Sequence, residues 1–380
     1  MKKAFILMVA SGILVFLQPL SAQTWETTKR LTWNPGTSAS PEIAIDSSDN
    51  IHLVWADETP GNLEIYYKKS ADGGTTWTTK RLTWISGWSE RPVIATDSSD
   101  NIHVTWYDYN PGNPEIFYKK STDGGITWTT KRLTTNSTQS VAPDITIDSN
   151  DNIHLVWYNE ETTGDYEIFY KKSTDGGTTW TTKRLTWNTE WSERPYIATD
   201  SNDNIYVVWY DFSPGNPEIF YKKSTDGGIT WTTKRLTSSS SNSIFPEIAI
   251  DSKDNINVIY RNDMPGNAEI YFKRSTNGGS LWTTTRLTWN SGASHGPTIT
   301  TDSINNIHVA WFDWTPGNFE IFYKRSTNGG VTWEDPHKLT WNSGSSNFPR
   351  LGTDSSNNIH LVWHDESSGN FEIYYRKGIQ

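Results

Sequence analysis

Two short segments place an aromatic ring, a carboxylate and a guanidinium side by side: Trp88-Ser89-Glu90-Arg91 and Trp191-Ser192-Glu193-Arg194. A flat indole can stack on the CH face of a sugar, and the charged groups can hydrogen-bond to its hydroxyls. These residues, together with the isolated Trp314, are therefore candidate ligand-binding residues. The alternative is that each Trp packs against a neighbouring unit and that Glu and Arg form a surface pair.

Histidines and acidic turns also recur along the chain, once in most repeats. The histidines are His52, His103, His154, His308 and His360, with Tyr206 and Asn257 at the matching positions of two further repeats. Metal ligands and catalytic groups converge on one point, whereas these residues are distributed over the whole chain, so we expect hydrogen-bonded structural residues. The Asp-rich segments, such as Asp46–Asn50, are expected to be hairpin turns, because they lack a Gly-containing loop of calcium ligands. No metal and no cofactor is predicted.

The elements that carry these residues belong to one repeat. A segment of the form SxDGGxTW, or a close variant, ends at Trp77, Trp128, Trp180, Trp231, Trp282 and Trp333, in steps of 51 or 52 residues. Each repeat contains four short runs rich in β-branched and aromatic residues, as in Thr78–Trp84, Pro41–Asp46, Ile51–Trp55 and Glu64–Lys69. Turn-forming clusters separate these runs, and no window has a helical period. A parallel β-helix has shorter repeats without hairpin turns, so a β-propeller is favoured.

The phase of the repeat predicts how the ring closes. Seven copies of the Pro-led run are present, so the expected fold is an all-β, seven-bladed propeller of four-stranded antiparallel blades. The segment around Thr27–Trp33 would be an outer strand without a blade of its own, and the last copy, near Pro349–Arg376, lacks its fourth strand. We therefore expect the N-terminal strand to complete the C-terminal blade, which hides strand edges that would otherwise favour aggregation.

The repeated box resembles the Asp-box, or bacterial neuraminidase repeat, of the sialidase superfamily, and in blade count it is closest to seven-bladed Asp-box propellers. Its acidic position is occupied by Asp72, Asp123, Asp175 and Asp226, and by Asn277 and Asn328 in the last two boxes. The resemblance implies that the boxes lie between the third and fourth strands, away from the active site. Physically, the Asp can accept hydrogen bonds from the turn, the Gly pair can adopt positive φ, and the Trp can cover the turn. A calcium site built from Asp72, Asp123, Asp175 or Asp226 is the alternative.

The same resemblance raises the question of sialidase activity. Membership of the family would imply a Tyr nucleophile activated by Glu, an Asp that acts as the acid, and three Arg that bind the substrate carboxylate. Arg91, Arg194 and Arg261 could supply such a triad, with Tyr107, Tyr158 or Tyr210 nearby. The family's Arg-Ile-Pro motif is absent, however, because Arg91 and Arg194 directly precede Pro. The catalytic sialidases also resemble six-bladed rings, whereas seven blades are expected in this chain.

Composition limits the environment and the partners. The chain has 380 residues, a net charge of −10 and no cysteine, which argues against nucleic acid or anionic membranes as partners and rules out disulfides. Lys2 and Lys3 precede an apolar run that ends near Leu20 and is followed by Ser21-Ala22. This pattern predicts a signal peptide over 1–22, a single propeller domain over 23–380 and no membrane insertion after cleavage. The expected location is therefore secreted, periplasmic or on the cell surface.

Three functions fit these observations. The favoured one is a non-catalytic propeller that binds a glycan or an extracellular protein through the face opposite the Asp-boxes, because near-identical repeats suit a multivalent binder. An exo-sialidase-type glycoside hydrolase is the first alternative. A structural surface or matrix protein is the second.

Overall fold

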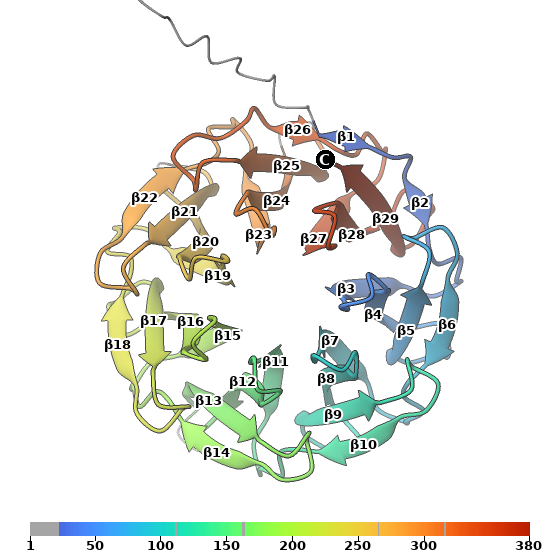
Figure 1. Cartoon of the computed structure of the whole chain (residues 1–380), viewed down its shortest axis with the longest axis horizontal. Helices are drawn as coiled ribbons and strands as arrows, with labels where there is room; N and C mark the ends of the chain where they lie inside the picture. The colour runs from blue at the N-terminus through green and yellow to red at the C-terminus, as the bar shows by residue number, and fades with distance from the viewer. Residues whose placement is uncertain (1–22, 111, 162–163, 265, 315–316) are drawn as a thin grey trace, which may run out of the picture.

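A computed structural model describes residues 23–110, 112–161, 164–264, 266–314 and 317–380. Seven antiparallel sheets surround a common centre (Figure 1), which confirms the all-β, seven-bladed propeller. The predicted signal peptide, residues 1–22, lies outside the described residues. Within the described part of the chain there is no helix of the length and apolar character needed to cross a membrane.

Each blade has an inner, a second, a third and an outer strand. The inner strands are β3 (Ser38–Ile45), β7 (Ser89–Thr96), β11 (Ser140–Ile147), β15 (Ser192–Thr199), β19 (Ser243–Ile250), β23 (Ser294–Thr301) and β27 (Ser346–Thr353). The second strands are β4 (Ile51–Asp57), β8 (Ile102–Asp108), β12 (Ile153–Glu160), β16 (Ile205–Asp211), β20 (Ile256–Asn262), β24 (Ile307–Asp313) and β28 (Ile359–Asp365). The third strands are β5 (Glu64–Ser70), β9 (Glu115–Ser121), β13 (Tyr166–Ser173), β17 (Glu218–Ser224), β21 (Glu269–Ser275), β25 (Glu320–Ser326) and β29 (Glu372–Ile379). The outer strands are β6 (Thr78–Arg81), β10 (Thr129–Arg132), β14 (Thr181–Arg184), β18 (Thr232–Arg235), β22 (Thr283–Arg286) and β26 (His337–Lys338), with β1 (Thr24–Trp25) and β2 (Lys29–Arg30) in the seventh blade.

The two ends of the described chain share a sheet, as the repeat phase predicted. Thr24 pairs with Ile379, and Lys29 pairs with Tyr375, so β1 and β2 together form the outer edge of the seventh blade. A second closure lies at the turns between inner and second strands. The backbone N–H and hydroxyl of Ser355 in the seventh blade donate to the carboxylate of Asp49 in the first, at 2.8 and 2.6 Å. The same contact joins other neighbouring blades, as where Ser98 donates to Asp151.

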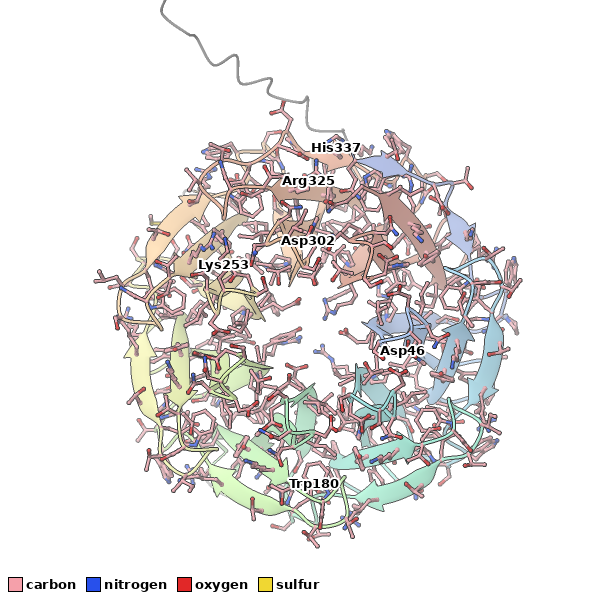
Figure 2. The ribbon with its side chains drawn as sticks, viewed as in Figure 1. Asp46, Trp180, Lys253, Asp302, Arg325 and His337 are labelled. Atoms are coloured by element: carbon pink, nitrogen blue, oxygen red, sulfur yellow. The ribbon has the colours of Figure 1, made fainter. Side chains whose placement is uncertain are left out.

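The hydrophobic core lies between blades rather than within them. Seven clusters of buried side chains each combine residues of two neighbouring blades, including the junction of the last blade with the first. Side chains fill these wedge-shaped spaces (Figure 2). The largest of them are the indoles on the second strands, which are almost fully buried: Trp55, Trp106, Trp157, Trp209, Trp311 and Trp363. A single blade could not bury these rings, so the stability of each blade depends on its neighbours.

The repeated histidines are structural, as expected. In the first blade, His52 Nδ1 lies 2.7 Å from the Tyr67 hydroxyl and His52 Nε2 lies 2.8 Å from Asp46. Where Tyr206 replaces the histidine, its hydroxyl donates directly to Asp200 at 2.6 Å. The Asp-rich segments are tight turns whose first Asp accepts hydrogen bonds from the turn backbone, as the sequence indicated.

The Asp-boxes form turns between third and outer strands. Asp123 accepts hydrogen bonds from the Ser121 hydroxyl and the Thr127 N–H, both at 2.8 Å. Gly125 has a φ of 94°, and a Cβ there would lie 2.7 Å from the Tyr67 ring of the preceding blade. The box therefore also locks one blade onto the next. Among the described residues, no group of three or more His, Asp or Glu side chains is arranged to hold a metal ion.

The inner strands differ from the expected boundaries. The sequence suggested that a strand starts at Pro41, but β3 starts at Ser38 and contains the proline. An inner strand has a free edge, and proline is tolerated on such an edge because no ladder hydrogen bond is lost. The outer strands are also shorter than expected: β6 ends at Arg81, three residues before Trp84.

Replacing Asp49 by Ala should lower the free energy of unfolding by about 1 kcal/mol, because it removes two hydrogen bonds to a charged acceptor at the closing junction. Urea unfolding measures this loss. Asp151→Ala removes the matching bonds at an internal junction and is the control. Equal losses are expected, and a loss confined to Asp151→Ala would contradict closure through Asp49.

Candidate functional site

Every inner strand contains a β-bulge at its proline. In the third blade the pairing with the second strand shifts register between Val141 and Asp144, on either side of Pro143. The residue before the proline has a positive φ in all seven blades, between 47° and 54°: Ser40, Arg91, Ala142, Arg194, Phe245, Gly296 and Phe348. Bulges re-aim side chains at the rims of closed sheets. Here the bulge turns the residues on both sides of the proline towards the centre of the ring.

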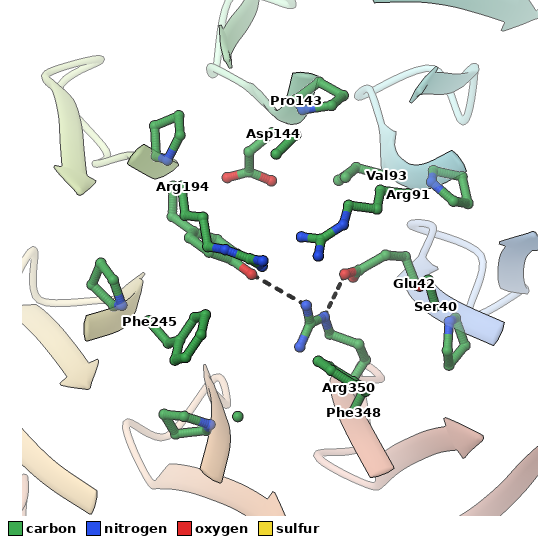
Figure 3. A pocket seen from close by; sticks show the side chains of 18 of the residues that line it. Ser40, Glu42, Arg91, Val93, Pro143, Asp144, Arg194, Phe245, Phe348 and Arg350 are labelled. Atoms are coloured by element: carbon green, nitrogen blue, oxygen red, sulfur yellow. Dashed lines mark hydrogen bonds and ion pairs between the residues drawn. The ribbon is translucent and has the colours of Figure 1, made fainter. Parts of the chain in front are cut away.

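These bulge residues line a pocket at the centre of the ring (Figure 3). The residues that follow the prolines form a second group: Glu42, Val93, Asp144, Tyr196, Glu247, Thr298 and Arg350. The bulges lie near the start of the inner strands, whereas the Asp-boxes follow the third strands at the opposite end of the blade. The pocket therefore opens on the box-free face, the face on which the sequence predicted ligand binding.

Three guanidiniums point into the pocket, but their partners differ (Figure 3). Arg350 forms an ion pair with Glu42, donates to the Tyr196 hydroxyl at 3.2 Å and lies 3.8 Å from Glu247. Among the described residues, Arg91 and Arg194 have no carboxylate within ion-pair distance. Arg194 stacks over the ring of Phe245, 5.0 Å from its centroid. Two cations thus face the pocket without an anion to balance them.

The acidic groups of the pocket hold protons more tightly than usual. Burial raises the pKa of Asp144 to about 8, and the nearby carboxylates of Glu42 and Glu247 add to the shift. Asp144 accepts a hydrogen bond from the Ile197 N–H at 2.8 Å, and no ion pair joins it to a cation within the described part of the chain. Burial also raises the pKa of Glu42 to about 7, against the opposing charge of Arg350. Near neutral pH, the pocket therefore carries less negative charge than its composition suggests.

Tyr196 is the phenol of the pocket. Burial raises its pKa to about 12, although the Arg350 guanidinium opposes the shift. A nucleophilic Tyr needs a lowered pKa or an adjacent base, and the Tyr196 hydroxyl accepts a hydrogen bond from Arg350 instead. The arrangement suits binding of an anionic group better than covalent catalysis.

The structure separates the candidate residues of the two WSER segments. Arg91 and Arg194 line the pocket, whereas the Glu side chains turn away from them. The Tyr107 hydroxyl donates to Glu90 at 2.5 Å, and the Tyr210 hydroxyl donates to Glu193 at 2.6 Å. Burial and the neighbouring Glu raise the pKa of both phenols. Neither tyrosine lines the pocket.

The three candidate tryptophans lie outside the pocket lining and are about half exposed. Each contacts aromatic rings edge-on: Trp88 contacts Tyr109, Trp314 contacts Phe319, and Trp191 contacts both Tyr166 and Phe212. They therefore present part of each indole to solvent on the same face as the pocket.

Arg261 does not converge with the other candidate arginines. It lies on β20, forms an ion pair with Asp263 at 2.8 Å and hydrogen-bonds to His295 at 2.9 Å. Tyr158, on β12, is also absent from the pocket lining. Arg350 supplies the third guanidinium, and sequence reasoning missed it together with Asp144, Glu42 and Tyr196. The signal was present, because the position after each repeated proline varies in chemistry while most other positions of the strand repeat.

Comparisons with known proteins agree with this architecture. A model of the BNR repeat-like domain matches residues 12–193. The match covers just under half of the chain, and the box that the sequence repeats continues around the seven-bladed ring, so the chain is described here as an Asp-box propeller. No curated protein matches the sequence of this Asp-box propeller.

Solved structures with the same fold share little sequence with this Asp-box propeller. A protein of unknown function from Dyadobacter fermentans is 14% identical, with a TM-score of 0.63 over 95% of this chain and 100% of that one. An ulvan lyase solved with -[GlcA(1-4)Rha3S]- is 10% identical, with a TM-score of 0.67 over 91% and 95% of the two chains. The intramolecular trans-sialidase from Ruminococcus gnavus is 15% identical, with a TM-score of 0.52 over 91% and 96%.

The bulge geometry makes a prediction about stability. Ala142 has a φ of 49°, a conformation that strains residues with a Cβ by about 1–2 kcal/mol. Ala142→Gly should therefore leave the free energy of unfolding unchanged or raise it by up to about 1 kcal/mol. Ala95 lies on an inner strand outside the bulge, and Ala95→Gly should lower the free energy of unfolding by about 0.5–1 kcal/mol. Urea unfolding compares the two variants, and equal losses would contradict strain at the bulge.

Proposed function

We propose that this Asp-box propeller is an exported, non-catalytic protein that binds an acidic glycan in the central pocket of its box-free face. One observation carries the proposal: Arg91 and Arg194 point into the pocket without a carboxylate partner among the described residues (Figure 3). Planar guanidiniums pair with carboxylates and sulfates through two parallel hydrogen bonds. A sugar acid or a sulfated sugar supplies such a group.

The remaining parts of the pocket support the same class of ligand. Asp144, largely protonated near neutral pH, can donate to a sugar oxygen. Phe245 and Phe348 give the wall an apolar surface for a ring face. Trp88, Trp191 and Trp314 lie on the same face, where they can contact the outer sugars of a longer chain or a glycan-bearing extracellular protein. The ulvan lyase of the same fold is bound to -[GlcA(1-4)Rha3S]-, and the trans-sialidase is in complex with oseltamivir carboxylate, so both hold a ligand with an acidic group.

Export follows from the predicted signal peptide over 1–22, which would place the protein outside the cytoplasm. A glycan ligand is consistent with that location. Exo-sialidase activity is the second candidate, because three guanidiniums share the pocket, but no pocket Tyr pairs with a Glu. A structural matrix role remains the third and needs no ligand.

Arg91→Ala and Arg194→Ala should each weaken binding of an acidic glycan by about tenfold or more, since each removes a charge-assisted pair worth about 1.5–3 kcal/mol. A glycan array of sialylated, uronate-containing and sulfated glycans, followed by calorimetry on the best ligand, measures this. Arg91→Lys keeps the positive charge but lacks the planar fork of donors, so its affinity should lie between those of the parent and of Arg91→Ala. Arg261→Ala changes a guanidinium outside the pocket and is the control.

Two results would count against the proposal. Binding of no acidic glycan, or binding unchanged in Arg91→Ala and Arg194→Ala, would remove its basis. Release of sialic acid from a fluorogenic sialoside, lost in Arg91→Ala, would overturn the non-catalytic part and favour the sialidase.

Binding should weaken as the pH rises through about 8. Asp144 loses its proton near that pH, and the new charge repels an anionic ligand while its donor is lost. The ligand's own acid group stays ionised throughout, so affinity should be highest near pH 6 and fall towards pH 9. Calorimetry at pH 6, 7, 8 and 9 measures the change. Burial raises the pKa of Glu42 to about 7, so Glu42 also titrates in this range. Asp144→Asn keeps a donor without titrating and should make the profile less steep between pH 7 and 9, and an equally steep profile in that variant would exclude Asp144 as a cause.

A further inference from the structure

Five tryptophans lie exposed at equivalent positions around the ring, just beyond the ends of the outer strands. They are Trp33, Trp84, Trp187, Trp289 and Trp341, here called the Trp belt, and 65–69% of each is exposed. The outer strands run from the box side to the opposite side, so the Trp belt lies on the rim of the pocket-bearing face. These residues belong to the repeat and carry no contact with the central pocket.

Each indole of the Trp belt is backed by a fixed cation. The Arg81 guanidinium lies 5.6 Å from the Trp84 ring centroid, donates to Glu64 at 2.9 Å and donates to the Thr83 carbonyl at 2.6 Å. Glu64 is buried, so the guanidinium is held in place and its charge is balanced. The same arrangement recurs at Trp33, Trp187 and Trp289, and Lys338 replaces the arginine at Trp341.

Two blades of the same chain lack the tryptophan and show that the fold does not need it. Thr135 and Ser238 stand at the matching positions, yet the Arg132–Glu115 and Arg235–Glu218 pairs form at 3.0 Å. The side chains of these two arginines are 36% exposed, against 22–28% for the four arginines beneath a tryptophan. The indole thus covers one face of the guanidinium, and the opposite face of the indole is exposed to solvent.

A pocket between the second and third blades occupies the position of the ring that is missing at Thr135. It is lined by Thr135, Trp157 and Lys171. The lysine equivalent to Lys171 in the sixth blade, Lys324, lies 5.6 Å from the centroid of Trp289. The belt tryptophan therefore fills a shallow site when present, and the sheet of the blade is complete without it.

We propose that the Trp belt is a multivalent site for a neutral polysaccharide, whose pyranose rings stack on the exposed indole faces. Each platform is electrically balanced, because its cation is paired with a buried glutamate, and the chain as a whole carries a charge of −10. An uncharged ligand meets no repulsion there, whereas a polyanion would. Each indole is held on one face by its cation, so it loses little conformational entropy when a ligand contacts the other face.

Area and spacing favour a polysaccharide over a second protein. A tryptophan offers at most about 250 Å², so one two-thirds-exposed indole falls far short of the roughly 800 Å² per partner of a stable protein interface. No blade has more than one platform, and polar segments separate the platforms, so they do not merge into one apolar patch. Trp289, Trp341, Trp33 and Trp84 occupy four successive blade junctions, a repeated pattern that matches a repeated ligand.

The test uses the substitutions that the chain itself carries. A variant with all five belt tryptophans changed to Thr should fold as the parent does, because Thr135 already occupies that position in one blade. In affinity gel electrophoresis with hydroxyethylcellulose and in pull-down with chitin and cellulose, it should bind at least tenfold more weakly than the parent. The single change Trp84→Thr should have a smaller effect, as expected for avidity. Leu281→Ser removes an equally exposed apolar side chain on the box face and should change nothing.

The outcomes separate this site from the central pocket. Arg91→Ala should keep full polysaccharide retention, whatever its effect on acidic glycans. Absence of retention by the parent on every neutral polysaccharide, or equal retention by the five-fold variant, would overturn the proposal. Sedimentation velocity tests for self-association of the protein. If the parent self-associates and the five-fold variant is monomeric, the Trp belt binds a second copy of the chain, and the polysaccharide proposal is overturned.

Discussion

Closure of the ring is the constraint on which the rest of the structure depends. Every hydrophobic cluster combines residues of two blades, so no blade has a core of its own. At the junction of the last blade with the first, β1 and β2 complete the sheet that begins with β27, and Leu31 beside β2 packs in the cluster between the two blades. The same dependence explains why the buried positions repeat so closely. A change in one wedge must fit the surface of the next blade, and interiors at crystalline packing density tolerate little change in volume.

The positions that escape this constraint carry the chemistry. Most residues on either side of the inner-strand prolines line the central pocket, and only some of them, such as Tyr196, Phe245 and Val93, also pack against a cluster between blades. The residue before the proline varies from Gly296 to Arg194, and the residue after it varies from Val93 to Arg350. The rest of each inner strand repeats from blade to blade. The bulge therefore brings variable residues from all seven blades to one place on a symmetric scaffold. Asymmetry of charge in the pocket arises there, because Arg350 pairs with Glu42 whereas Arg91 and Arg194 have no carboxylate partner in the part of the chain that the structure describes.

Much of the fold could be predicted from the sequence, and the physical reason is the repeat. Alternating β-branched residues, turn clusters and the fixed step identified the strands, the blade count and the shared last blade.

The pocket could be predicted only in part. Arg91 and Arg194 stood out because they break the repeat, but Trp88 and Glu90 beside them point elsewhere, because the register shift at the proline changes which side chains face the centre. Arg350 and Asp144 were missed for the same reason. Arg261 stood out equally and yet pairs with Asp263 on the second strand. The exposure of Trp84 and its equivalents was also hidden, since a repeated tryptophan is typical of a core.

The shared sheet at the ends of the chain has a consequence for orientation. Ile379 lies at the end of a third strand and pairs with Thr24, so both ends of the described chain lie on the side of the Asp-boxes. A tether attached at either end would therefore hold the molecule by its Asp-box face. The central pocket and the Trp belt would then look outward, free to reach a large or insoluble ligand without steric interference from the attachment.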